Sequence, residues 1–459
     1  MFNRDRARWA LSSALSIAFL SAPAVWNRFP LLQWDTGDYI AGWYEHTLMI
    51  SRSTVYGLFL NAASPLAFWP VVVVQSALTA WVMALTMRAI GLRNRPWTFI
   101  CTIALLSILT TLPWLTSILL TDIFAVVGVL GLYLLLLRAD VLIRPERIGL
   151  VLLVAFSAAT HNATLAVLMG LFILAVVVWR FAPRQLPGGR LIDGGVALVL
   201  GVVLVFSGNY YIARTISWTP GGFALSFGRM LQDGIVNKYL DAHCPDPYLR
   251  LCKYKDELPR NADEFFWHSP LFDKLGRFAG LGREMESIAL GCLKEYPLLQ
   301  IETAARATAQ QLVDVHTGEG VENVPWTYGI IKENLPQLTL AMEAARQQEQ
   351  SDGVAQVFPL INEVHYPVAL AAMTALPLIV VLAFLELTPF AFGELATVCI
   401  VALLGNAFVC GALADPHDRY GARMVWIAVF AVALTLAQTA ERLRWARARS
   451  APSSEPLLY

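Results

Sequence analysis

Two polar stretches near the amino terminus carry side chains suited to acid–base and phosphate chemistry. Asp35 and Asp38 lie in the first stretch, and Arg52 and Tyr56 lie in the second. A carboxylate can accept a proton from a hydroxyl, and a guanidinium can bind a phosphate through two hydrogen bonds. Aspartates in such loops also form turns and cap helices, so residue type alone leaves both interpretations open.

Three later places put polar groups directly beside apolar runs. Asp122 precedes one run, His161 lies between two runs, and Arg419, Tyr420 and Arg423 precede the last run. Each has a structural alternative. Asp122 can cap a helix, His161 can be a satisfied polar side chain in a packed bundle, and an Arg-Tyr pair can anchor a helix at a membrane interface. Ionisable groups at membrane depth usually face cavities, so these residues are also candidates for a site.

The composition shows which elements must position these residues. Of the 459 residues, 57% are hydrophobic and 15% are charged, and the mean hydropathy is +0.55. The apolar residues form runs of roughly twenty, the length that a helix needs to cross a bilayer. Lys and Arg together number 34, as do Asp and Glu, so no excess of positive charge suggests a nucleic-acid partner. The sequence therefore predicts an all-α polytopic membrane protein.

We predict about ten spanning helices from the apolar runs. The run at 148–161 is too short to cross alone and breaks at Thr160-His161-Asn162. The first run also resembles a signal peptide, but the loop after it is typical of one that follows an uncleaved helix. The ten runs lie at about 9–27, 66–90, 97–115, 120–138, 148–161, 162–181, 192–213, 366–387, 393–413 and 421–440.

Arginines flank alternate connections between these runs, which predicts both termini in the cytoplasm. We therefore expect an N-terminal bundle at 1–213 with a first external loop at 28–65, an external domain at 214–366, and C-terminal helices with a basic cytoplasmic tail at 367–459. The flanking arginines are Arg4, Arg6 and Arg8; Arg88, Arg93 and Arg95; Arg138, Arg144 and Arg147; Arg180, Arg184 and Arg190; and Arg442, Arg444, Arg447 and Arg449.

The external domain is expected to be mainly helical. Apolar residues recur at helical spacing in 281–296 and again in 298–315. Cys244 and Cys252 flank a short Pro-Asp-Pro turn on the oxidising side of the membrane, which favours a disulfide between them. His243 alone supplies too few ligands nearby for a zinc site.

The first external loop resembles the GT-C superfamily of membrane glycosyltransferases, which includes aminoarabinose transferases and protein O-mannosyltransferases. Asp35-Thr-Gly-Asp-Tyr39 resembles an Asp-Ser-x-x-Tyr stretch of bacterial members. Arg52-Ser-Thr-Val-Tyr56-Gly resembles their Arg-x-Pro-x-Tyr-Pro stretch, with Thr54 and Gly57 in place of the prolines. By register, the resemblance puts Asp35 on the catalytic aspartate of the family, whereas Asp38 has no such match and is the weaker catalytic candidate.

Three other elements extend this resemblance along the transmembrane part of the chain. The stretch from Leu119 to Tyr133 is similar to a family element in which an aspartate, here Asp122, precedes an apolar run, and it suggests a second acidic site. His161 lies where relatives often have Lys or Arg. Arg419-Tyr420 resembles the Arg-Tyr that opens the final span in many relatives.

The resemblance implies an inverting transfer of a sugar from a polyprenyl-phosphate donor to a lipid, glycan or protein acceptor in a bacterial inner (plasma) membrane, with the large domain periplasmic. Asp35 would be the general base. No metal is required, and a divalent cation between Asp35 and a phosphate stays compatible with the sequence. The residues implied to bind the donor phosphate are Arg52, Tyr56, His161, Arg419, Tyr420 and Arg423.

Two other functional classes share this helix count. A transporter or lipid flippase should show internal repeats and polar residues at the bilayer midplane, and the sequence suggests neither. A non-catalytic envelope assembly protein would use the external domain as a binding module. Membrane lipids are partners in every case, because the apolar runs need lipid as their solvent.

Overall fold

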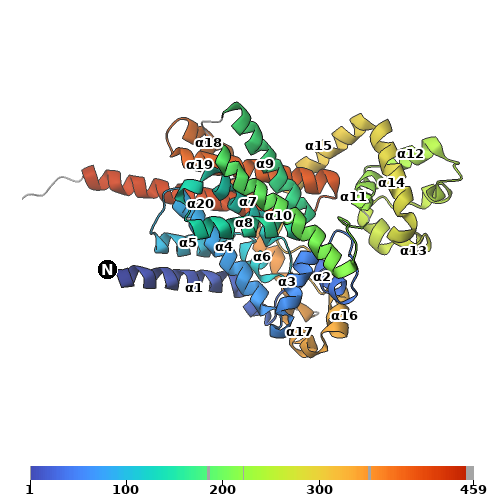
Figure 1. Cartoon of the computed structure of the whole chain (residues 1–459), viewed down its shortest axis with the longest axis horizontal. Helices are drawn as coiled ribbons and strands as arrows, with labels where there is room; N and C mark the ends of the chain where they lie inside the picture. The colour runs from blue at the N-terminus through green and yellow to red at the C-terminus, as the bar shows by residue number, and fades with distance from the viewer. Residues whose placement is uncertain (1, 183–186, 221, 350–352, 451–459) are drawn as a thin grey trace, which may run out of the picture.

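The computed structural model describes residues 2–182, 187–220, 222–349 and 353–450, and the regular elements in these residues are helices (Figure 1). A bundle of long helices forms one part, and shorter helices gather at one end of it. The bundle helices are α1 (Phe2–Asn27), α4 (Trp69–Ala89), α5 (Pro96–Leu109), α7 (Ile123–Leu137), α8 (Arg144–Thr160), α9 (Asn162–Phe181), α10 (Gly188–Ala213), α18 (Phe358–Phe384), α19 (Phe390–Ala407) and α20 (Asp418–Ser450).

Seven stretches of helix in the described residues are long and apolar enough to cross a membrane. They are Asp5–Asn27, Trp69–Ala89, Asn162–Phe181, Gly188–Ala213, Val354–Phe384, Phe390–Ala412 and Asp418–Arg442. Large apolar side chains on their outer faces lie exposed, including Ile173 at 56%, Val199 at 63% and Phe384 at 85%. Exposure of such a continuous apolar surface to water is unfavourable, whereas lipid solvates it, so the chain is a multi-pass membrane protein.

Fewer than the expected ten helices among the described residues are long enough to span a membrane, because three bundle helices are short. α5 ends at Leu109, and the six-residue helix α6 (Leu112–Ser117) follows it. α7 has 15 residues and therefore extends about 22 Å, less than a hydrocarbon core of about 30 Å. α8 has 17 residues and ends at Thr160, as the break predicted at His161 requires.

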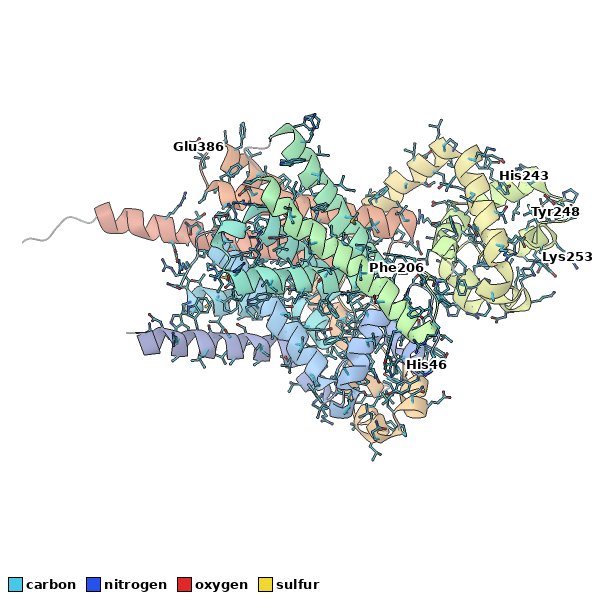
Figure 2. The ribbon with its side chains drawn as sticks, in the orientation of Figure 1. His46, Phe206, His243, Tyr248, Lys253 and Glu386 are labelled. Carbon is cyan, nitrogen blue, oxygen red and sulfur yellow. A yellow bond between two sulfur atoms is a disulfide. The ribbon has the colours of Figure 1, made fainter. Side chains whose placement is uncertain are left out.

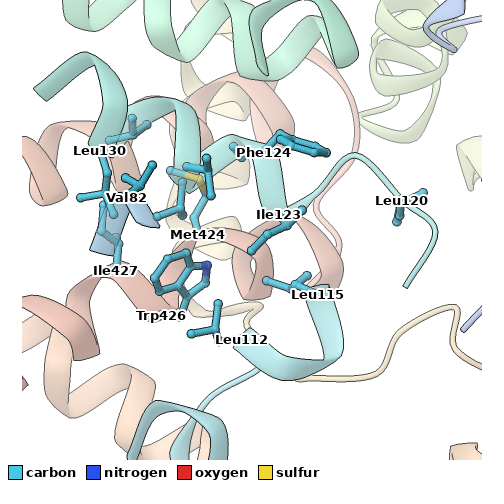
Figure 3. Packing of buried hydrophobic residues seen from close by; sticks show 14 of the residues in the cluster. Val82, Leu112, Leu115, Leu120, Ile123, Phe124, Leu130, Met424, Trp426 and Ile427 are labelled. Atoms are coloured by element: carbon cyan, nitrogen blue, oxygen red, sulfur yellow. The ribbon is translucent and has the colours of Figure 1, made fainter. Parts of the chain in front are cut away.

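α7 tolerates its short length because other helices surround it. Its residues from Ile123 to Leu136 are all buried, and it packs against α4, α8 and α10. Ile123 and Phe124 belong to the same buried hydrophobic cluster as Leu115 of α6 and Met424 of α20, which Figure 3 shows. A helix enclosed by protein need not match the thickness of the lipid.

The segment between α10 and α18 contains two separately packed parts. α11 (Gly222–Gln232), α12 (Ile235–His243), α13 (Pro270–Lys274) and α14 (Arg277–Glu295) enclose their own hydrophobic core. The later helices α16 (Pro325–Asn334) and α17 (Thr339–Glu343) instead join the core of the bundle. α15 (Pro297–Val313) connects the two parts, so the two helices predicted at 281–296 and 298–315 are confirmed as α14 and α15.

Two short helices lie beside this segment at the same end of the bundle. They are α2 (Trp34–Tyr44) and α3 (Thr54–Ala63), and α2 packs against α16. We call this end, where α2, α3 and α11 to α17 gather, the domain end. The start of α1 points to the opposite end, as does the carboxyl-terminal part of α20 (Figure 1).

The structure predicts that Glu386 and Tyr248 are reached from opposite sides of the membrane, because they lie at opposite ends of the molecule (Figure 2). Single-cysteine variants at these positions, made after the free cysteines Cys101, Cys292, Cys399 and Cys410 are replaced by alanine, test this arrangement. A membrane-impermeant maleimide added to sealed vesicles should label one variant and spare the other. Equal labelling of both would contradict the arrangement.

Cys244 and Cys252 form a disulfide in the structure, in the connection after α12. The bridge spans a sequence separation of 8, for which loop closure in the unfolded chain predicts about 2.5 kcal/mol of stabilisation. Cys252→Ser should therefore lower the unfolding temperature of the part formed by α11 to α14. Cys101→Ser, at an exposed free thiol, is the matched control. Two free thiols at these positions in non-reduced peptides would refute the bridge.

Candidate active site at the domain end

Backbone pairing brings the first polar loop beside the amino end of α7. The amide of Leu31 donates to the carbonyl of Ser117 at 3.0 Å, and the amide of Leu119 donates to the carbonyl of Leu31 at 2.9 Å. The hydroxyl of Thr36 also donates to the carbonyl of Leu119 at 2.9 Å. These bonds fix the first turn of α2, with Asp35 in it, next to Asp122.

The first turn of α2 begins at Trp34 because Gln33 caps it. The side-chain oxygen of Gln33 accepts from the amide of Asp35 at 2.7 Å, and the hydroxyl of Thr36 accepts from the amide of Gln33 at 3.1 Å. This reciprocal arrangement satisfies two backbone groups that a helix start leaves open. Asp35 is therefore not the cap of the helix, and its carboxylate is available for other partners.

Arg52 reaches the site from the start of α3. Ser53 caps α3, accepting from the amides of Val55 and Tyr56, and donates to the carbonyl of Ala159 at 2.7 Å. Since Ala159 lies near the end of α8, this bond places Arg52 on the same side of the bundle as His161.

Arg419 enters the site from the first turn of α20. Its backbone amide donates to Oε2 of Glu319 at 2.6 Å. The turn lies so close to the preceding segment that a Cβ on Gly421 would be 2.0 Å from the carbonyl oxygen of Asp314. Only glycine allows this approach, which brings Arg419 close to α2.

Asp35 lies between two guanidinium groups. Arg52 donates to its Oδ1, and Arg419 donates to its Oδ2 at 2.9 Å. Burial by itself raises the pKa of Asp35, but the positive charges of Arg52 and Arg419 outweigh it and lower the pKa below its ordinary value. Asp35 is therefore an ionised carboxylate at neutral pH.

Asp38 is held by different partners, one turn further along α2. Its Oδ2 accepts from Arg52 at 3.2 Å, and its Oδ1 accepts from the indole of Trp326 at 3.0 Å. Burial raises the pKa of Asp38 above its ordinary value, since the charge of Arg52 offsets the cost of burial only in part and Asp35 adds repulsion. The two neighbouring aspartates thus have pKa values displaced in opposite directions.

Asp122 forms the deepest carboxylate of the network and is 1% exposed. Arg423 donates to its Oδ1 at 3.5 Å, and Nε of Arg419 lies 3.3 Å from its Oδ2. That second contact is not aligned as a hydrogen bond, so both Asp122 Oδ2 and Arg419 Nε lack a hydrogen-bond partner among the described residues. A ligand that offers both a donor and an acceptor would satisfy them.

Arg423 is completely buried and forms an ion pair with Oδ1 of Asp122, whereas Arg419 lies beside Oδ2. It donates to Oδ1 of Asn406 from Nε at 3.2 Å and from Nη2 at 2.8 Å. Its Nη1 is also 3.4 Å from Nδ1 of His161. Because this guanidinium is 0% exposed, it positions other groups and lies apart from the surfaces that a ligand would touch first.

One pocket opens on the side of Asp38 and Arg52. It lies between α2, α3 and α10, and its wall includes Trp43, Met49 and Ile212. The polar groups are thus at one edge of a mainly apolar surface, which suits a ligand with a charged head and an apolar tail.

A second pocket opens on the side of Asp122 and Arg419. Glu319 and Trp114 also line it, together with apolar residues of α6 and the loop before α7. The ion network therefore separates two pockets, and Arg419 lies where it can contact ligands in the second of them.

The structure thus brings Asp35, Asp38, Arg52, Asp122, His161, Arg419 and Arg423 into one cluster. Tyr56 is buried behind it and donates to Gln75 at 3.0 Å, and Tyr420 lies beside both α20 arginines. Sequence reasoning missed Trp326, Asn406 and Glu319. Their partners lie 288, 17 and 100 residues away, and no local pattern marks them.

No family model, curated protein or solved structure matches the chain. A functional assignment therefore depends on the chemistry of this cluster and on the two pockets beside it.

Replacing Arg423 by methionine should reduce stability by about 3 kcal/mol, because it leaves a buried carboxylate oxygen of Asp122 without its cation. Adding Asp122→Asn to Arg423→Met should recover part of this loss. Arg147→Met is the control, since Arg147 is 44% exposed in its pair with Asp193 and should contribute less than about 1 kcal/mol. The stabilities of the wild type, the two single variants and the double variant are measured by thermal unfolding in detergent. Equal losses for Arg423→Met and Arg147→Met would contradict the buried pairing.

Proposed function

We propose that this chain is a GT-C-type membrane glycosyltransferase that moves a sugar from a polyprenyl-phosphate donor to an extracytoplasmic acceptor. The observation that carries the proposal is Asp35, an ionised carboxylate between Arg52 and Arg419, with a pocket on either side of the network. Such a site combines a proton acceptor with two phosphate-binding groups, and both are needed to displace a phosphate from a sugar.

The resting charges of the cluster support phosphate binding. Asp35, Asp38 and Asp122 are matched by Arg52, Arg419 and Arg423, so the cluster as a whole is close to neutral. A phosphate would compete with Asp35 for the two guanidinium groups beside it. Because those groups lower the pKa of Asp35, their transfer to a phosphate would make Asp35 a stronger base once the donor is bound.

The reaction would be a single displacement. The acceptor oxygen forms a bond to the anomeric carbon while the bond from that carbon to the phosphate oxygen breaks. The hydroxyl proton passes to the carboxylate of Asp35, and the lipid phosphate leaves with both electrons of the broken bond. Arg52 and Arg419 stabilise the charge that grows on the phosphate, and attack opposite the leaving group inverts the anomeric centre.

We assign the first pocket to the donor and the second to the acceptor. Ile212 and Met49 give the first pocket the apolar wall that a lipid chain requires, and Arg52 lies at its edge. Asp122 and Arg419 line the second pocket, and an acceptor hydroxyl could bond to the Oδ2 and Nε atoms of these residues, which have no hydrogen-bond partner among the described residues. A divalent cation is not needed for this scheme and remains compatible with it.

The proposal also includes the arrangement in the membrane. The basic groups at alternate connections favour cytoplasmic termini, which would put the domain end in the periplasm of a bacterial inner membrane. The shorter helices α5, α7 and α8 would then complete ten crossings with the seven longer ones. A transporter is the alternative, but its polar residues should lie near the middle of the bundle, whereas this cluster gathers at helix ends.

Asp35→Asn should lower turnover by roughly 10²–10⁴-fold, because the amide keeps the size of the side chain but cannot accept the proton. Asp38→Asn is the matched control on the same helix and should have a milder effect. The measurement is release of polyprenyl phosphate from a panel of polyprenyl-phosphate sugars, per folded molecule in lipid. Wild-type turnover in Asp35→Asn would remove the general base from the scheme.

The phosphate-binding groups are tested with the same panel. Arg52→Ala and Arg419→Ala should weaken donor binding, whereas Asp35→Asn should not weaken it, because it removes the carboxylate that competes with the phosphate for the two guanidinium groups. Activity of the wild-type protein with none of the donors would shift the assignment toward transport or scaffolding.

A further inference from the structure

A second polar cluster lies between the external helices and the loop that leads into α20. It consists of Asp263, Asp415 and His417, whose ligand-type atoms lie within 4.8 Å of one another. Nε2 of His417 is 3.6 Å from Oδ2 of Asp263 and 3.9 Å from Oδ2 of Asp415. Both separations exceed hydrogen-bond length, so the three atoms face a common point without bonding to one another.

Other contacts hold these side chains in this orientation. Nδ1 of His417 lies 2.7 Å from Oε1 of Glu319, and a proton on Nδ1 donated to this carboxylate would leave the lone pair on Nε2. Oδ1 of Asp415 accepts from Gln232 at 2.5 Å and from Arg229 at 3.3 Å. The other oxygen of Asp415 is thereby directed toward His417. A histidine whose second nitrogen donates to a carboxylate is the usual arrangement of a metal-binding imidazole.

We infer that Asp263, Asp415 and His417 bind a divalent transition-metal cation of the Zn²⁺ class. One imidazole and two carboxylates suit zinc, whereas Mg²⁺ and Ca²⁺ prefer oxygen ligands alone. Ligand atoms about 2.0–2.2 Å from a tetrahedral zinc are roughly 3.3–3.6 Å apart. The two separations from His417 are within a few tenths of an ångström of this spacing, and the two carboxylate oxygens, within 4.8 Å of each other, would close the remaining distance by side-chain rotation. Two carboxylates also balance the charge of the ion, and a water molecule would fill the fourth position.

The ion would connect two parts of the protein that are otherwise distant in sequence. Asp263 belongs to the external part enclosed by α11 to α14, whereas Asp415 and His417 precede α20. Glu319 contacts His417 through Oε1 and the amide of Arg419 through Oε2. The cation would therefore fix the external part against the turn that presents Arg419.

Zinc binding by the full chain tests this inference without any sugar donor, so its outcome is independent of the proposed transferase activity. Protein dialysed against EDTA is titrated with ZnCl₂ by calorimetry, and unfolding temperatures are measured with and without zinc. We expect one zinc per chain and a higher unfolding temperature on binding. Asp263→Asn and His417→Ala should each weaken binding by at least about 100-fold, and Glu319→Gln by about 10-fold.

His243→Ala is the matched control. His243 lies in the same external part and pairs with Glu295 at 3.2 Å, outside the cluster, so its replacement should leave zinc affinity unchanged. Asp263→Asn should fold normally, because Asn is nearly isosteric with Asp and the side chain of Asp263 is 47% exposed. Equal zinc affinity in wild type and in both ligand variants would overturn the site. Absence of zinc binding to the wild-type protein would also overturn the site. In that case a protonated His417 would connect the two carboxylates.

Discussion

Charges taken out of water must be paired, because an isolated buried ion costs several kcal/mol. In this protein the requirement acts at the domain end, where Asp35 of α2, Asp122 before α7 and two arginines of α20 come together. None of these elements could move away without leaving a charge unpaired. The meeting of α2, α7 and α20 is therefore set by electrostatics as much as by packing, and the arrangement of the neighbouring loops depends on it.

Apolar packing makes this pairing possible by holding α7 in the centre of the bundle. α7 contacts α4, α8 and α10 along its length, and its amino end carries Asp122 to the domain end. The long helices around it present apolar side chains outward, where lipid rather than water is their solvent. A helix that is enclosed in this way can be short, and its end can support a polar site instead of meeting the membrane surface directly.

The two arginines of α20 at this site differ in burial and in hydrogen bonding. Arg423 is completely buried and bonded to Asn406, whereas Arg419 borders a pocket and retains an unpartnered N–H. In the proposed function, structural and ligand-binding roles are thus divided between two arginines one turn apart. Glu319 extends the network outward, since it contacts both the first turn of α20 and His417. The part formed by α11 to α14 meets the same loop through Arg229 and Gln232, which both donate to Asp415.

The sequence by itself determined the membrane class, the break at His161, the helices α14 and α15 and the residue types of the site, because hydropathy and helical period are local properties. It could not determine which charges pair. Asp35 and Arg419 are 384 residues apart, and Asp38 and Trp326 are 288 apart. Nor did run length show that α7 is enclosed by protein, since a buried helix and a lipid-facing helix are equally apolar. Those features depend on long-range packing, which only the tertiary structure decided.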